Sequence, residues 1–188
     1  RLSPPRSPCT PVQDGHSQGQ VAGVPRDCGR IAEIGKLDGR QAHEVLDAEG
    51  MHVAPGFVDL HTHYDAQLFW DPYCTLSGWH GITSAVIGNC GFGFAPARKE
   101  SRERLLQMMT RTEQIPYDTM VEGMGLDWDW ESLPEWMDHL DALPKGVNVL
   151  SYVPLNPLLV YVMGLEGAKA GREATPEELA KKLRMPLE

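Results

Sequence analysis

Short apolar segments alternate with longer amphipathic ones along most of the chain. Three apolar or β-branched segments begin at or directly after a glycine and are predicted to be strands: 57–62, 81–87 and 146–153. Nearly continuous apolar strands are typical of parallel sheets covered on both faces. Because these strands alternate with helical segments, the pattern predicts βα units and an α/β fold.

Four amphipathic or capped segments are predicted to be helices. They span 100–112, 116–122, 132–143 and the residues after 175. The last two begin with capping boxes, Ser132 with Glu135 and Thr175 with Glu178. In such a box, each residue's side chain bonds the other's backbone N–H, which fixes where the helix begins.

The first 54 residues lack this alternation. Residues 1–20 contain four prolines and almost no apolar side chains, so they are predicted to form a disordered arm. Residues 21–54 hold short apolar pieces separated by glycines, which favours a small β segment. The third predicted region, 55–188, contains the alternating strands and helices.

Composition excludes several classes of partner. The chain has 17 Lys and Arg against 26 Asp and Glu, a formal net charge of −9. Nucleic acids and anionic membranes bind clustered Lys and Arg, so neither is expected as a partner. No run approaches the roughly 20 apolar residues of a membrane helix, and a secretory signal pattern is absent. The four cysteines form no CxxC pair, so we expect a cytoplasmic protein.

Length limits the fold. A closed eight-stranded α/β barrel needs about 250 residues, and this chain has 188. The first residue is Arg1 rather than Met, and residues 183–188 continue directly from a helical pattern. We therefore expect a fragment that holds a truncated barrel.

The sharpest chemical signal lies at the end of the first predicted strand, in the segment VDLHTHYD. Strand side chains alternate between faces, so Asp59, His61 and His63 are predicted to point the same way. Two imidazoles so spaced can bind one metal ion, and sites of parallel α/β folds lie at the carboxyl ends of strands. We interpret His61 and His63 as metal ligands; the alternative is a chance HxH. Asp65 would orient a histidine or cap the strand end.

A second signal follows the next strand, in GNCGFGF. Cys90 is predicted at the same level of the sheet as His63, and a thiolate is a good zinc ligand. Gly91 and Gly93 would let the backbone bend closely around an ion or substrate. The alternative is a buried apolar thiol within a plain turn. The segment is not a phosphate loop, because GxxxxGK[ST] is absent.

The other histidines and the tryptophans have structural interpretations. His80 precedes a predicted strand, at the end of the sheet opposite the site, and His139 lies within a predicted helix. Trp128, Trp130 and Trp136 are interpreted as helix-docking anchors, with the lining of a substrate entrance as the alternative. The remaining histidines fall in the arm and the β segment, away from the predicted site: His16, His43 and His52.

Two segments, APGFVDLHTHYDAQ and HGITSAVIGNCGFGFAP, resemble the amidohydrolase superfamily, and more narrowly its N-acyl-D-amino-acid deacylase group. GRIAEIG is similar to that group's N-terminal β segment, and DWDWESLPEWMDHLDALPKGVNV also resembles it. The resemblance covers about Gly29 to Leu179. It implies the first part of a metal-dependent (β/α)8 barrel that hydrolyses non-peptide carbon–nitrogen bonds of small-molecule N-acyl amino acids.

The resemblance also implies a role for each candidate ligand. Cys90 matches a ligand of the tightly held Zn²⁺, and His61 and His63 match the HxH pair of a second, weaker metal position. Two further histidine ligands and the general-base Asp are expected beyond Glu188. On this interpretation the segment alone is catalytically inactive.

The chain departs from the family pattern after its third predicted strand. Many relatives carry a His-Ser pair and then an Arg where this chain has Leu155, Asn156 and Leu159. If these residues face the substrate, the pocket is more apolar than usual and the preference for D-amino acids is open. Two alternative functions remain: an amidohydrolase acting on a cyclic amide or ureide, and an inactive fragment that only binds metal.

Overall fold

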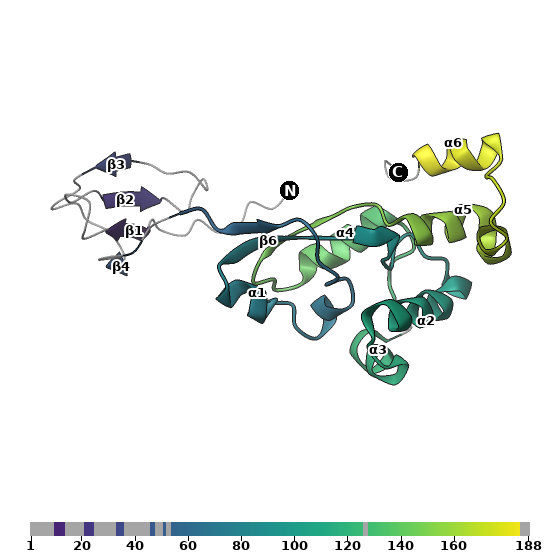
Figure 1. The fold of residues 1–188 in the computed structure, drawn as a ribbon, viewed down its shortest axis with the longest axis horizontal. Coiled ribbons are helices and arrows are strands. Elements are labelled where there is room, and N and C mark those ends of the chain that lie inside the picture. Colours follow the sequence, from purple (N-terminus) through teal and green to yellow (C-terminus); the bar gives the residue numbers. More distant parts are fainter. Residues whose placement is uncertain are drawn as a thin grey trace. The chain divides into compact units, whose positions relative to one another are not determined.

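The computed structural model describes residues 10–13, 21–24, 33–35, 46–47, 51, 54–125 and 128–184. The chain divides into two compact units, Arg1–Pro55 and Gly56–Glu188 (Figure 1). The predicted boundary between the β segment and the α/β region, at 54 and 55, thus lies within two residues of the boundary between the units.

The first unit holds a four-stranded sheet with the strand order β3-β2-β1-β4. Its strands are β1 (Thr10–Gln13), β2 (Val21–Val24), β3 (Glu33–Gly35) and β4 (Leu46–Asp47). Strand β2 pairs antiparallel with both β1 and β3, and β1 pairs parallel with β4.

Strand β1 lies within residues 1–20, the segment that the sequence predicts to be a disordered arm. The arm was predicted because its side chains cannot bury a core, but strand pairing uses the main chain. Thr10 to Gln13 pair in continuous register with Val24 to Val21 of β2. The other residues of that arm lie outside the described residues, as do His16, His43 and His52.

The second unit is built on a three-stranded parallel sheet with the order β5-β6-β7. The strands are β5 (Phe57–Asp59), β6 (Ile82–Ile87) and β7 (Asn148–Ser151). All three predicted strands are present, each shorter than predicted. Because the strands are parallel, their carboxyl ends lie at the same edge of the sheet.

Helices connect and cover these strands. The four predicted helices correspond to α2 (Arg102–Glu113), α3 (Tyr117–Met124), α4 (Leu133–Ala142) and α6 (Pro176–Arg184). Helical elements that were not predicted are η1 (Gln67–Phe69), α1 (Thr75–Trp79), η2 (Asn89–Gly91), η3 (Lys99–Ser101) and α5 (Leu155–Lys169). None of the helices in the described ranges combines the length and hydropathy of a membrane span.

Both predicted capping boxes form. The backbone N–H of Glu135 donates to Ser132 Oγ, and the Glu135 carboxylate accepts from the backbone N–H of Ser132 at 2.8 Å. At α6, the Thr175 N–H donates to Glu178 Oε2 at 2.8 Å, and the Glu178 N–H donates to Thr175 Oγ1 at 3.3 Å.

An aromatic cluster forms much of the core beside the sheet. Trp128, Trp130 and Trp136 are 5%, 2% and 1% exposed. The Trp128 and Trp130 rings stack with centroids 5.1 Å apart, and the Trp130 indole N–H donates to the Phe94 carbonyl at 3.0 Å. The tryptophans are therefore anchors in the core, as interpreted. His139 packs on this cluster, with its ring 4.8 Å from that of Trp130.

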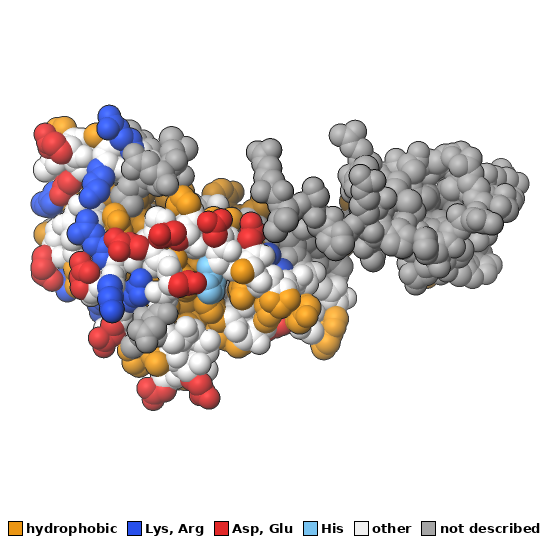
Figure 2. Space-filling view, turned by 180° about the vertical axis from the view of Figure 1, so that it is seen from behind, with side chains coloured by type: hydrophobic (Ala, Val, Ile, Leu, Met, Phe, Trp, Pro, Cys, Tyr) orange, Lys and Arg blue, Asp and Glu red, His pale blue; other side chains and the backbone are white. Residues whose placement is uncertain are grey.

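The two faces of the parallel sheet differ. Ala85 and Ile87 of β6 face the helices and are fully buried. On the other face, Val58 pairs with Ser84 and Leu150 pairs with Val86, and the Val58 and Leu150 side chains are 55% and 52% exposed. Exposed apolar side chains also lie between interspersed acidic and basic ones on the face drawn in Figure 2.

Candidate metal centre

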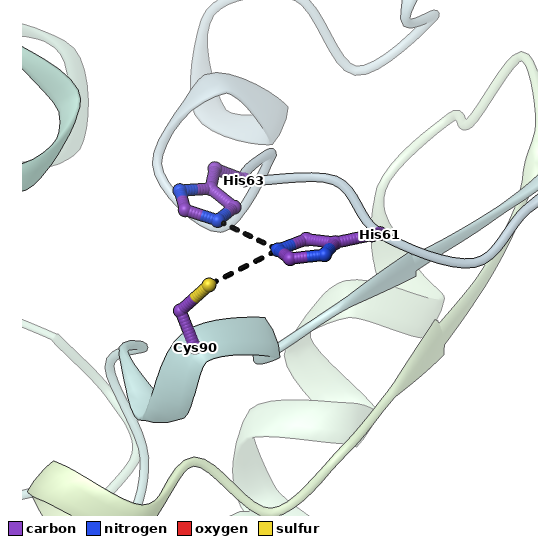
Figure 3. A group of neighbouring side chains, drawn as sticks. All are labelled: His61, His63 and Cys90. Atoms are coloured by element: carbon purple, nitrogen blue, oxygen red, sulfur yellow. Dashed lines mark hydrogen bonds between the residues drawn. The ribbon is translucent and has the colours of Figure 1, made fainter.

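His61 and His63 lie in an extended segment directly after β5. The strand was predicted to reach Thr62 but ends at Asp59. The extended direction nevertheless continues, because the Thr62 N–H and Oγ1 both donate to the Val86 carbonyl, at 3.0 and 2.9 Å. Thr62 is thus buried against β6, and the histidines on either side of it turn their rings toward each other (Figure 3).

Asp59 does not join the histidines, although the alternation of a strand predicted that it would. Its Oδ1 accepts the backbone N–H of His61 at 3.1 Å. The strand has already ended at this residue, so the carboxylate bonds the main chain of the following segment instead of facing the site.

Cys90 is carried by η2, a tight turn that follows β6. Its backbone is in the left-handed region, with φ 56°, which costs a residue with a side chain about 1–2 kcal/mol. Gly88 begins the turn with φ 76°. A Cβ atom at Gly88 would lie 2.6 Å from the Tyr152 carbonyl oxygen, so the backbones approach as closely as only glycine allows. The turn directs Cys90 toward the histidines.

The three candidate side chains converge on one point (Figure 3). His61 Nε2 lies 3.3 Å from His63 Nε2 and 3.1 Å from Cys90 Sγ. All three potential ligand atoms lie within 4.8 Å of one another. Two ligands of one tetrahedral zinc ion are separated by about 3.3 to 3.6 Å, given the usual Zn–N and Zn–S bond lengths. The donor set and its spacing therefore fit a zinc ion.

Two carboxylates lie behind this group. His63 Nδ1 is 2.8 Å from Glu113 Oε1, at the end of α2. Asp65 is 3% exposed, and its burial raises the pKa of its carboxyl group to about 7, with a smaller contribution from the charge of Glu113. The Gly88 N–H donates to Asp65 Oδ2 at 3.4 Å. Asp65 thus links the segments that follow β5 and β6.

Sequence reasoning missed Glu113. It is 50 residues from His63, and no motif marks it. One signal was available, because a carboxylate at the C-terminal end of a helix is electrostatically unfavourable. His80 lies where it was expected, just before β6 and therefore at the opposite end of the strand from Cys90.

The start of α5 adjoins the turn that carries Cys90. A Cβ atom at Gly91 would lie 3.3 Å from Leu155 Cβ and 3.4 Å from Asn156 Nδ2. Leu155 is 46% exposed, so it offers an apolar surface beside the turn. Leu159, one turn further along α5, is half-buried.

In comparisons with known proteins, most of the chain matches a single family model. Residues 44–185 match the model described as the amidohydrolase family. The chain is 34% identical over 151 residues to a D-aminoacylase of Alcaligenes xylosoxydans xylosoxydans, an alignment that covers 80% of this chain and 28% of that protein.

Two solved structures have a similar fold. One is a D-aminoacylase studied for its binuclear metal center, with a TM-score of 0.64, 28% identity and coverage of 91% of this chain and 34% of that chain. The other is an N-acyl-D-glutamate deacylase from Bordetella bronchiseptica complexed with zinc and a phosphonate inhibitor. Its TM-score is 0.62, with 26% identity and coverage of 94% of this chain and 35% of that chain. The chain thus spans about a quarter of the length of the curated relatives and a third of the solved ones.

Proposed function

The chain belongs to the amidohydrolase family, and from that premise we propose that it supplies part of the active site of a zinc-dependent N-acyl-D-amino-acid deacylase. Such an enzyme hydrolyses an amide carbon–nitrogen bond that is not a peptide bond. The observation that carries the proposal is the convergence of the His61, His63 and Cys90 ligand atoms within 4.8 Å.

The fold that we propose for residues 55–188 is the first part of a (β/α)8 barrel. Two of the three parallel strands, β5 and β6, are followed by candidate ligands at their carboxyl ends, where barrel enzymes build their sites. The exposed apolar face with Val58 and Leu150 also supports a barrel, because the inner wall of a closed barrel would bury it. Residues 21–54 would then belong to a small β domain that precedes the barrel in the sequence.

The metal that we propose is zinc. Two imidazole nitrogens and a thiolate suit this ion better than the oxygen-seeking Mg²⁺ or Ca²⁺. When bound, zinc lowers the pKa of a coordinated water and polarises an amide carbonyl. His61 and His63 would each present a neutral Nε2, and Cys90 would bring a full negative charge. We assign Cys90 to the tightly held zinc and the histidine pair to a weaker position.

The substrate that we propose is a small N-acyl amino acid. The similarity of the chain to a D-aminoacylase and to an N-acyl-D-glutamate deacylase supports this class. Leu155 contributes an apolar, half-exposed side chain beside the Cys90 turn. We therefore expect an apolar amino-acid side chain to be preferred over a charged one.

Zinc retention tests the metal assignment. The protein encoded by the longest open reading frame that contains this segment is loaded with ZnCl2 and dialysed, and its bound zinc is counted by mass spectrometry. We expect wild-type protein to retain zinc and Cys90→Ser to lose it, because the thiolate supplies the only negative charge among the three ligands. His61→Asn should keep stoichiometric zinc, because His61 belongs to the weaker position. His80→Asn is its matched control, since His80 lies at the other end of β6. Zinc retained in Cys90→Ser at the wild-type level would contradict the assignment.

Activity is tested in the longest open reading frame that contains this segment. That protein is assayed for release of the free amino acid from N-acetyl-D-methionine, N-acetyl-L-methionine and N-acetyl-D-glutamate, with a cyclic ureide as the competing substrate class. We expect the first substrate to be cleaved fastest. Cleavage of the ureide, with none of the three N-acetyl amino acids cleaved, would contradict the deacylase proposal.

A further inference from the structure

Glu113 is the carboxylate that touches the candidate metal centre from another element. Its Oε1 lies 2.8 Å from His63 Nδ1, and the two side chains are 12% and 30% exposed. The contact is thus largely shielded from water, where a charge-assisted hydrogen bond is stronger than at the surface.

The position of Glu113 is unfavourable for its own helix. It is the last residue of α2, where the helix macrodipole repels a negative charge. The buried carboxyl group of Asp65 lies close enough for the two acids to interact electrostatically. Glu113 therefore lies at a position where a carboxylate destabilises its own helix. Such local conflicts are expected at functional sites.

The geometry selects one tautomer of His63. A carboxylate only accepts hydrogen bonds, so the contact with Glu113 requires the proton on Nδ1. The Nε2 lone pair is then free, and Nε2 is the atom that lies 3.3 Å from His61 Nε2 in the convergent group. A carboxylate on the far nitrogen of a ligating histidine fixes the ring and raises its basicity.

We propose that Glu113 is a positioning residue, which holds the His63 ring and its Nδ1–H tautomer so that Nε2 is presented to the metal. This inference rests on the proposed zinc site. It adds a residue from α2 to a site that is otherwise formed by the segments after β5 and β6.

The tautomer is measured first, without metal. Long-range ¹H–¹⁵N spectra of the metal-free chain at pH 8 distinguish protonated from unprotonated ring nitrogens. We expect wild-type His63 to carry its proton on Nδ1, and Glu113→Ala to shift the proton toward Nε2, the form favoured by a free imidazole. Glu103→Gln, at the exposed start of the same helix, removes the same charge and should leave the spectrum unchanged. A wild-type His63 with its proton on Nε2 would overturn the proposal.

Zinc affinity is measured next, by competition with a chromophoric chelator. We expect Glu113→Ala to bind zinc about 10–100-fold more weakly than wild type, the usual effect of losing such a partner. Glu113→Gln keeps the size and an acceptor oxygen but not the charge, so its loss should be intermediate. Glu103→Gln should bind like wild type. Equal affinity in wild type, Glu113→Ala and Glu113→Gln would overturn the role of Glu113.

The two experiments separate this inference from the proposed function. A wild-type chain that binds no zinc would sink the zinc site itself, and the role of Glu113 toward the metal falls with it. Loss of affinity in both Glu113 variants, with wild-type zinc binding intact, supports both. If Glu113→Ala does not fold, as judged by circular dichroism, the isosteric Glu113→Gln decides the question.

Discussion

Cys74 and Cys90 place the same side chain in two different environments. Cys74 is 1% exposed, and burial, aided by the charge of Asp71, raises the pKa of its thiol to about 11. Cys90 is exposed in the turn after β6. Only a thiolate reacts with an alkylating agent, so access and ionisation both protect Cys74.

We expect brief iodoacetamide treatment at pH 8 to modify Cys90 and to spare Cys74, as read by peptide mass spectrometry. A pH of 8 lies below the raised pKa of Cys74, so that thiol stays protonated while the protein is folded. Zinc should slow the modification of Cys90. Repeating the reaction in denaturant, where both peptides should be modified, provides the control. Faster labelling of Cys74 than of Cys90 in the folded chain would contradict the burial and the raised pKa of the Cys74 thiol.

The residues of the site differ in how visible they are in the sequence. His61, His63 and Cys90 were predicted as ligands because each lies at or directly after the end of a predicted strand, and parallel strands bring their carboxyl ends together. Asp59 was misplaced, because β5 ends earlier than its apolar pattern suggests. Glu113 was not identified, because its contact with His63 depends on how α2 packs; its unfavourable position at the end of that helix was the one local signal.

At the scale of elements, η2 sets the direction of the Cys90 side chain. Gly88 has φ 76° and would place a Cβ atom 2.6 Å from the Tyr152 carbonyl. Gly88→Ala therefore adds a backbone conformation that L residues disfavour and a clash with main chain that cannot swing aside.

We expect Gly88→Ala to lower the free energy of unfolding by about 2–4 kcal/mol, measured by urea denaturation. Gly171→Ala is the control, because Gly171, just after the end of α5, also has a positive φ, 63°, but has no heavy atom within 4 Å of the added Cβ. The difference between the two variants isolates the clash. Equal losses in both would mean that backbone strain alone makes Gly88 necessary.

Helices were predictable where their starts carry a chemical signal. The capping boxes at Ser132 and Thr175 correctly predicted where α4 and α6 begin. Helix α5 was missed, because its residues are apolar on most sides and give no amphipathic period. Its helical path is also broken at Gly164, where φ is 74°.

At the scale of the whole molecule, the exposed face of the parallel sheet has the largest consequence for behaviour. Val58 and Leu150 expose more than half of their side chains, and exposed apolar strands promote association.

We expect Leu150→Thr to reduce binding of an anilinonaphthalene dye and to raise the solubility of the 188-residue chain, with a change in stability within about 0.5 kcal/mol. Val149→Thr is the control, because Val149 packs against the core from the opposite face and its loss should cost about 1–2 kcal/mol. In the protein encoded by the longest open reading frame, a closed barrel would bury Leu150. Leu150→Thr should then lower the free energy of unfolding of that protein as well. Unchanged stability there would argue against a barrel that covers this face.

The stacking of Trp128 on Trp130 has an optical consequence. Two indole chromophores with ring centroids 5.1 Å apart share their electronic excitation, so their ultraviolet transitions split into bands of opposite sign in circular dichroism. The size of this couplet depends on the inclination of the two transition dipoles, and it vanishes when the rings separate. The stacked pair belongs to the core, whereas the convergent ligands lie beyond the sheet's edge. The chain therefore carries an intrinsic chromophore that reports on melting of its helical layer without any label.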